Sequence, residues 1–270
     1  MIFMMRPIQE FPSHVAEDLL GLFFDIDDTF TSNGKIESKA FEALWLARNA
    51  GLKLVPVTGR PAGWCDHMAR MWPVDGVVGE NGAFSFWYDE ADQKLKKRFM
   101  DPDEVRKEKR GRLEAVKKEI LESVPGAALA SDQLYRETDL AIDYCEDVPP
   151  LPWKEVERIC TIFLKHGATC KVSSIHVNGW FGDYSKLDMT RLFVQERWGF
   201  DLDSLRERFM FCGDSPNDEP MFEYFPYSAG VKNIGRFTEA LKHLPPFVAG
   251  HEGGAGFAEI VQVLIALRKP

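Results

Sequence analysis

The chain has 270 residues, of which 45% are hydrophobic and 28% are charged, a composition typical of a globular protein with one large or two modest domains. Its 33 Lys and Arg residues against 42 Asp and Glu residues give a net charge of −9, which argues against a nucleic-acid-binding protein. Because prolines and an acidic residue interrupt the first apolar segment and no long apolar run follows, we expect neither a signal peptide nor a membrane span.

The five cysteines are scattered along the chain, and none forms a C-x-x-C pair or a zinc-type cluster with histidine. We therefore expect reduced thiols and a cytoplasmic protein.

The first third of the chain alternates apolar runs with helical patterns. Residues 19–25 form an apolar run that ends at Asp25, which is typical of a strand buried on both faces. Asn33-Gly34 predicts a tight hairpin turn, because both residues tolerate positive φ. The elements predicted next are a helix over 37–50, a strand over 52–60, a helix over 61–71 and a short strand before Phe84. This order predicts the beginning of a doubly wound α/β sheet.

The middle of the chain has a different character. Residues 84–99 alternate polar and apolar side chains around a turn, which predicts an antiparallel hairpin. The patterns that follow predict a charged helix over 102–124, a strand over 138–146, a helix over 153–166 and two strands in ATCKVSS and IHVNGWF. These patterns indicate an α+β unit.

The α/β pattern returns in the last third. A helix is predicted over 186–198, an apolar strand over 208–214, a strand over 246–252 and a closing helix over 255–268. The fold class predicted is therefore α/β, a Rossmann-like doubly wound parallel sheet with an inserted α+β domain. We expect a discontinuous core over 15–83 and 185–270 and an inserted domain over 84–184.

Three apolar strands end in polar tips: DIDDT (25–29), TGR (58–60) and GDSPND (213–218). Ligands of open parallel sheets bind beyond the carboxyl ends of the strands, so we expect these tips to meet. Clustered carboxylates repel one another unless a cation compensates them, and an all-oxygen cluster favours Mg²⁺.

The four segments DIDDT, VTGR (57–60), Lys186 and GDSPND resemble, in order and spacing, the four motifs of the haloacid dehalogenase-like hydrolases. The ENGA turn (80–83) and the long insertion resemble the type IIB branch with a C2 cap. That branch includes sucrose-phosphate phosphatases, mannosyl-3-phosphoglycerate phosphatases, Cof-like sugar-phosphate phosphatases and phosphomannomutases. The resemblance covers both core segments.

The resemblance implies a role for each matching residue. Asp25 would be the nucleophile, and Asp27 the general acid and then the general base. Mg²⁺ would be held by Asp25, the backbone carbonyl of Asp27 and Asp214, with Asp218 as a ligand or as a partner of one. The residues expected to bind the phosphate or the substrate are Thr58, Gly59, Arg60, Lys186 and Asn217, the last of these orienting Lys186 or the metal shell.

Several assignments keep an alternative. Arg60 could contact the substrate phosphate or pair with a nearby carboxylate. Lys171 is a rival to Lys186, because Leu187 stands where many relatives have Gly. Asp28 is expected to be a solvated turn residue. The alternating residues of the predicted cap strand could line the substrate pocket or form an ordinary polar face; they are His176, Asn178 and Trp180.

The function predicted is a Mg²⁺-dependent phosphatase that hydrolyses a small phosphorylated metabolite, a sugar phosphate or a phosphoglycerate-type ester, through an aspartyl-phosphate on Asp25. The alternatives are a phosphomutase with the same motifs and a non-catalytic metabolite-binding protein.

Overall fold

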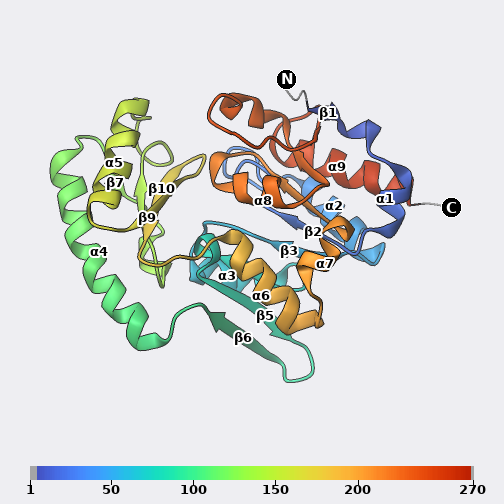
Figure 1. Cartoon of the computed structure of the whole chain (residues 1–270), viewed down its shortest axis with the longest axis horizontal. Coiled ribbons are helices and arrows are strands. Elements are labelled where there is room, and N and C mark those ends of the chain that lie inside the picture. The colour runs from blue at the N-terminus through green and yellow to red at the C-terminus, as the bar shows by residue number, and fades with distance from the viewer. Residues whose placement is uncertain (1–4, 269–270) are drawn as a thin grey trace.

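The computed structural model describes residues 5–268, and its centre is a six-stranded parallel sheet with the strand order β1-β13-β12-β11-β2-β3 (Figure 1). The strands are β1 (Arg6–Pro7), β2 (Gly21–Phe24), β3 (Lys53–Pro56), β11 (Phe209–Gly213), β12 (Ser228–Gly230) and β13 (Phe247–Val248). The neighbouring strands β2 and β11, both inside the sheet, are fully buried. Their near-continuous apolar sequence therefore matches a strand covered on both faces.

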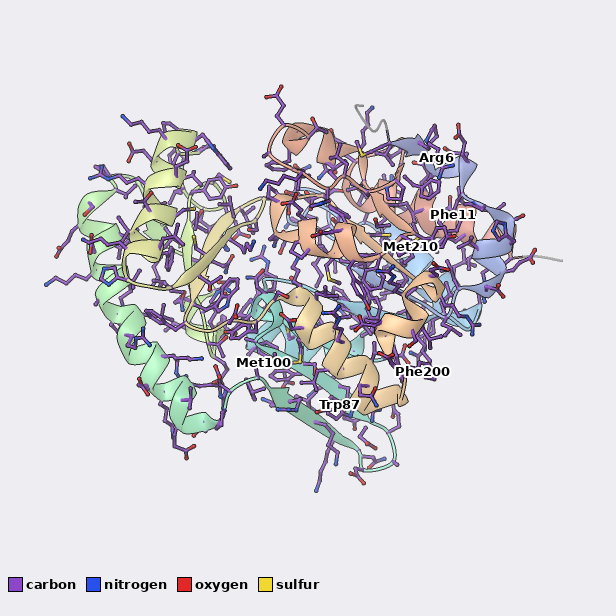
Figure 2. All side chains as sticks on the ribbon, viewed as in Figure 1. Arg6, Phe11, Trp87, Met100, Phe200 and Met210 are labelled. Carbon is purple, nitrogen blue, oxygen red and sulfur yellow. The ribbon has the colours of Figure 1, made fainter. Side chains whose placement is uncertain are left out.

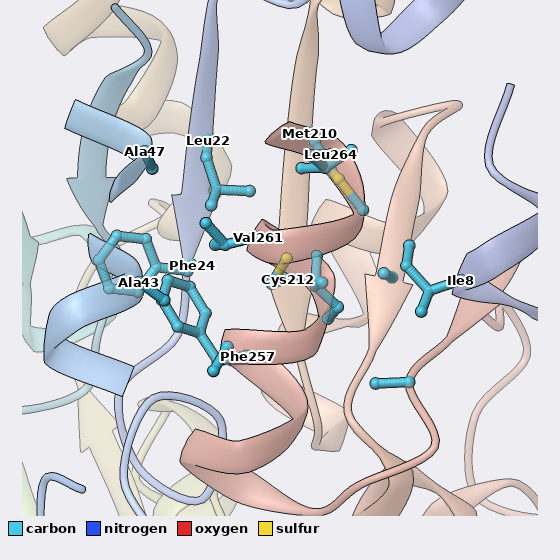
Figure 3. Close-up of a cluster of buried hydrophobic side chains, with 14 of the residues drawn as sticks. Ile8, Leu22, Phe24, Ala43, Ala47, Met210, Cys212, Phe257, Val261 and Leu264 are labelled. Carbon is cyan, nitrogen blue, oxygen red and sulfur yellow. The ribbon is translucent and has the colours of Figure 1, made fainter. Parts of the chain in front are cut away.

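Helices cover both faces of this sheet. One face carries α1 (Ser13–Asp18), α2 (Ser38–Asn49) and α9 (Gly253–Leu267), and the other carries α6 (Lys186–Trp198), α7 (Leu202–Leu205) and α8 (Glu219–Tyr224). Successive strand residues point to opposite faces. Phe24 accordingly packs against Phe257 of α9, with ring centroids 5.0 Å apart (Figure 3). Phe23 packs against Phe209 and Phe225 on the other side of the sheet.

A three-stranded antiparallel sheet continues beyond β3. It consists of β4 (Val77–Gly79), β5 (Phe84–Asp89) and β6 (Lys94–Phe99), and a parallel bridge between Val57 and Val78 joins it to the end of β3. Trp87 of β5 lies beside α6, where its ring meets Phe193 edge-on with centroids 6.3 Å apart (Figure 2). The 84–99 hairpin thus pairs and packs with the core, and we propose that the inserted domain begins near residue 100 instead of 84.

The inserted unit is an antiparallel sheet covered by two long helices (Figure 1). Its elements are β7 (Ala128–Leu129), β8 (Leu140–Asp143), β9 (Thr169–Val172), β10 (His176–Trp180), α4 (Asp103–Ser123) and α5 (Trp153–Lys165). The strand order is β7-β8-β10-β9. Val116, Ile120, Phe163 and Val177 belong to a separate hydrophobic cluster of this unit. We refer to residues 100–184 as the cap.

The predicted fold class is confirmed. Long elements with clear periodicity lie where the sequence places them, including α3 (Ala62–Met71), whereas the strand predicted over 246–252 is only the two-residue β13. Strand β12 was not predicted, because Ser228, Ala229 and Gly230 give no apolar run. None of the helices formed by residues 5–268 combines the length and the apolar character that a membrane crossing requires.

Candidate active site

The polar tips of the strands meet at the carboxyl edge of the parallel sheet. Asp25 follows β2 and Asp214 follows β11, and these two strands are paired neighbours. Thr58 comes two residues after β3, the neighbour of β2 on its other side. Lys186 opens helix α6 after Ser185, whose side chain caps the helix by accepting the backbone N–H of Asp188. The predicted convergence of these segments is therefore present in the fold.

Three carboxylates and one ammonium group form the centre of the site. Asp25, Asp214 and Asp218 are buried, and each offers an oxygen within 4.8 Å of the other two. Nζ of Lys186, also buried, donates to Oδ1 of Asp25 at 2.7 Å and to Oδ1 of Asp218 at 2.6 Å. Three carboxyl groups face a single ammonium group, so the cluster is net negative once all three are ionised, which is the electrostatic condition for holding a cation.

The burial of this cluster changes its protonation. Burial, aided by the nearby charges of Asp218 and Asp27 and opposed by Lys186, raises the pKa of Asp25 to about 8. Burial and the charges of Asp25 and Asp218 also raise the pKa of Asp214 well above its ordinary value. For Lys186, burial alone would lower the pKa, but the contacts with Asp218 and Asp25 outweigh it and raise the pKa. A lysine that stays charged is suited to hold anionic oxygens.

Fixed donors orient the carboxylate of Asp214. Thr29 Oγ1 donates to Oδ1 at 3.1 Å, and Asn233 Nδ2 donates to Oδ2 at 2.8 Å. Oδ2 of Asp218 accepts the backbone N–H groups of Asp214 at 3.1 Å and of Ser215 at 3.4 Å. Asn233 was missed in the sequence because it follows the unpredicted strand β12, in a segment without a motif.

The predicted phosphate-binding residues lie around the same centre with different partners. Oγ1 of the buried Thr58 accepts the backbone N–H of Arg60 at 3.0 Å, and Gly59 lies against the side chain of Asn81. Asn217 was expected to orient Lys186 or the metal shell. Its Oδ1 instead accepts from Ser215 Oγ at 2.8 Å, and its Nδ2 donates to Asn81 Oδ1 at 3.4 Å.

Arg60 joins the core to the cap. Its Nε donates to both oxygens of Asp27, at 2.9 and 3.0 Å. Its Nη2 donates to Oε1 of Glu146 in the cap at 2.7 Å, and its Nη1 donates to Oδ2 of Asp132 at 3.2 Å. The guanidinium also lies over the ring of Trp64, 4.5 Å from its centroid. Arg60 was expected either to contact the substrate phosphate or to pair with a carboxylate, and in this structure it pairs with carboxylates.

The core and the cap enclose a small cavity beside the nucleophile candidate. Its lining includes Asp25, Asp27, His176 and Asn178, and its volume is only about 10 Å³. That is room for about one water molecule, so the cap lies closed over the site. The third candidate of the cap strand, Trp180, lines a neighbouring cavity of about 350 Å³.

Residues 22–114 match the sequence family of haloacid dehalogenase-like hydrolases. That segment contains the first two motifs, and the structure adds Lys186, Asp214 and Asp218 to the same site. Over residues 22–114 the chain is similar to the haloacid dehalogenase-like hydrolases, as its motifs predicted. No curated protein sequence matches the chain.

Solved structures share the fold of this protein over nearly the whole chain. The protein 0175 of Thermoplasma acidophilum has 20% identity and a TM-score of 0.68, with 92% of this chain and 99% of that chain covered. The sucrose-phosphatase of Synechocystis sp. PCC6803 has 13% identity and a TM-score of 0.62, covering 91% and 97%. A subclass IIB sugar phosphatase, BT4131, has 16% identity and a TM-score of 0.57, covering 84% and 92%. These likenesses establish the fold, including the type of insertion predicted.

Four charged residues of the protein were not identified as site residues from the sequence, because three lie outside the motifs and the fourth, Glu80, was noted only as part of the ENGA turn. They are Glu80, Asp132, Arg136 and Glu146, which link the second motif to the cap. Glu80 is buried at φ 43° within the ENGA turn. Its carboxylate accepts the backbone N–H groups of Ala62 at 3.0 Å, Glu137 at 2.9 Å and Thr138 at 2.7 Å. The ENGA turn was recognised in the sequence, but the cap residues that donate to Glu80 could not be predicted from it.

Proposed function

We propose that this hydrolase is a Mg²⁺-dependent phosphatase that acts on a small phosphorylated metabolite through Asp25. The observation that carries the proposal is the contact of Lys186 with Asp25 at the sheet edge, beside Asp214 and Asp218. A carboxylate nucleophile, a fixed cation and a cluster of oxygen ligands are the groups that phosphoryl transfer requires. The five free cysteines fit the predicted cytoplasmic location.

The residues fit a divalent cation. Asp25, Asp214 and Asp218 bring three carboxylates against the single ammonium of Lys186. Oxygen-only donors suit Mg²⁺, and a bound cation would offset the repulsion that accompanies their burial. Asp25, Asp214 and the backbone carbonyl of Asp27 would hold the ion, with Asp218 as a further ligand or as the partner of one. The ion would supply charge neutralisation for the phosphate oxygens.

The chain's own groups would carry two steps. In the first, an oxygen of Asp25 bonds to phosphorus while the bond to the leaving alcohol breaks, and Asp27 donates a proton to the departing oxygen. In the second, Asp27 takes a proton from water, the water oxygen bonds to phosphorus and the Asp25–phosphorus bond breaks. Thr58 and Lys186 would hold the transferred oxygens, because phosphoryl transfer depends mainly on positioning and charge stabilisation.

The cavity lining favours a neutral, hydroxylated leaving group such as a sugar. His176, Asn178 and Ser174 offer polar groups there, and the cation at this cavity, Arg60, already pairs with three carboxylates. A carboxylate-bearing leaving group, as in a phosphoglycerate-type ester, would find less positive charge to recognise it. The sucrose-phosphatase and the sugar phosphatase with the same fold agree with this preference.

A panel of phosphoesters tests the proposal. Sugar phosphates, phosphoglycerate-type esters and p-nitrophenyl phosphate would be incubated with the protein, with Mg²⁺ or with a chelator, and inorganic phosphate measured. We expect Mg²⁺-dependent phosphate release, highest with sugar phosphates. Transfer to a second hydroxyl without phosphate release would identify a phosphomutase. Inactivity with every ester would contradict an enzymatic role and favour a binding protein.

A further inference from the structure

Four of the five N–H groups of Arg60 donate hydrogen bonds to carboxylates. Nε donates to Asp27, Nη2 donates to Glu146 Oε1 at 2.7 Å, and Nη1 donates to Asp132 Oδ2 at 3.2 Å and to Glu146 Oε2 at 3.4 Å. Nη2 also lies 2.8 Å from Asp27 Oδ1, an ion-pair contact without hydrogen-bond geometry. Because a guanidinium has five N–H donors, carboxylates engage most of them, and little is left of Arg60 for a substrate phosphate while the cap is in this position.

The three carboxylates do not depend on Arg60 equally. Asp132 is held independently by Arg136, whose Nε and Nη2 donate to its two oxygens at 2.9 and 3.0 Å. Glu146 has one further neighbour, Nε2 of His176 on β10, at 2.9 Å but at an angle that does not complete a hydrogen bond. Asp27 and Glu146 thus share Arg60 as their guanidinium partner, one on each edge of its plane.

The segment before the cap sheet is fastened to the core. Arg136 donates to the carbonyl of Gly59 at 2.9 Å, and Glu80 accepts the backbone N–H groups of Glu137 and Thr138. These contacts bury charged groups with satisfied partners, which makes them costly to break. Residues 132–139 are thus held against the core by several buried contacts, whereas Glu146, which lies past β8, contacts the core through Arg60. A cavity of about 10 Å³ has no room for a substrate, so the cap must move from this position to admit one.

We propose that the Arg60–Glu146 ion pair is a latch that holds the cap closed and orients Asp27 at the same time. Glu146 touches no reacting atom and acts through Arg60, so it is a positioning residue. When the cap opens, Arg60 loses the partner that fixes one edge of its plane, and Asp27 loses its fixed orientation with it. Closing the cap therefore also fixes the orientation of Asp27, the acid/base group. The part of this inference that concerns catalysis rests on the proposed function.

Hydrogen exchange tests the latch without a substrate. Glu146→Gln keeps the size of the side chain and removes its charge, and Glu157→Gln, on the exposed face of α5, is the matched control. We expect amides of residues 144–147 and 173–178 to exchange about fivefold faster or more in E146Q than in the wild type, with no change in E157Q. Equal exchange in E146Q and the wild type would overturn the latch.

Kinetics test the coupling to Asp27. With Mg²⁺ and an ester that the wild type hydrolyses, we expect E146Q to lower kcat by about tenfold with a smaller change in KM, because the acid/base group loses its orientation. Arg60→Lys retains one charge but cannot contact both carboxylates along two edges, so R60K should show the same loss. The E146Q and R60K effects should not add in the double variant.

The two proposals fail in different ways. Faster exchange in E146Q with an unchanged kcat would overturn the coupling of the latch to Asp27. A wild type that releases no phosphate from any ester would contradict the proposed phosphatase activity, while the exchange comparison would still decide whether Arg60 and Glu146 hold the cap.

Discussion

Nζ of Lys186 lies 2.7 Å from Oδ1 of Asp25, although 161 positions separate the two residues in the chain. The contact is buried, and its lysine opens the first core helix after the cap. The whole cap is thus inserted between two residues that meet in one site. This arrangement allows the cap to lie directly over the nucleophile candidate while both residues remain fixed by the core sheet.

Asp25→Asn should abolish activity and preserve the fold. An amide cannot form the aspartyl-phosphate, so we expect phosphate release to fall by at least about a thousandfold. Removing a carboxylate from a crowded, buried cluster should not lower the free energy of unfolding. Phosphate assays and denaturant unfolding would measure the two effects. Wild-type turnover in this variant would refute the mechanism.

Asp214→Asn should remove the stabilisation of the protein by Mg²⁺. A ligand at a hundred times its Kd stabilises the folded state by about 2.7 kcal/mol, which raises the Tm of the wild type. The variant loses one of three clustered carboxylates, so Mg²⁺ should no longer raise its Tm. Asp28→Asn is the control, because Asp28 has φ 56°, a conformation that Asn adopts readily, and lies outside the cluster. An equal Mg²⁺ response in D214N and wild type would exclude Asp214 as a ligand.

Lys186→Met and Lys171→Met distinguish the two candidate lysines. The first substitution leaves Asp25 and Asp218 buried without their shared cation, which we expect to cost about 3–5 kcal/mol of unfolding free energy. Lys171 is exposed on β9, so its replacement should change stability by less than about 0.5 kcal/mol and leave phosphate release intact. Loss of activity in K171M with full activity in K186M would reverse the assignment.

Gly82→Ala should destabilise the protein by distorting the start of α6. Gly82 has φ 105°, and a Cβ added there would lie 2.0 Å from the carbonyl oxygen of Ser185, the residue before Lys186. We expect a loss of about 3 kcal/mol in unfolding free energy, from backbone strain and overpacking, and a lower kcat. Gly111→Ala is the control: it lies in α4 with open space around it, so the better helix former should be neutral or stabilising.

The contribution of Glu146 to stability should depend on pH in a defined direction. Burial alone would raise the pKa of Glu146, but contact with His176 and Arg60 outweighs it and lowers the pKa from 4.5 to about 2. A lowered pKa in the folded state means stabilisation that is fully present above the unfolded value and lost as the pH falls through the folded value.

The difference in unfolding free energy between wild type and E146Q should therefore be constant from about pH 7 to about pH 5 and should shrink between about pH 4.5 and pH 2. Denaturant titrations across this range would measure it. A difference that grew on acidification would contradict the charged contact between Glu146 and Arg60.

The sequence by itself determined the core of this protein and the centre of its site. Buried parallel strands are continuous apolar runs, and a chain that leaves such a strand must place its next residues at the sheet edge. Asp25, Thr58 and Asp214 could therefore be brought together from local patterns. The long helices could also be predicted from the sequence, because an apolar stripe that repeats over three or four turns is typical of a helix with one buried face.

Tertiary structure alone decided the partners of these residues. The pairing of the 84–99 hairpin with the core depends on which sheet edge is free, and a local alternation of polar and apolar residues does not specify that. The partner of Arg60 was also undecided from the sequence, which allowed either a substrate phosphate or a carboxylate. The fold places Glu146, 86 positions away, against it. An ion pair depends on the distance between its two side chains in the folded protein, and the sequence around either residue does not predict its partner.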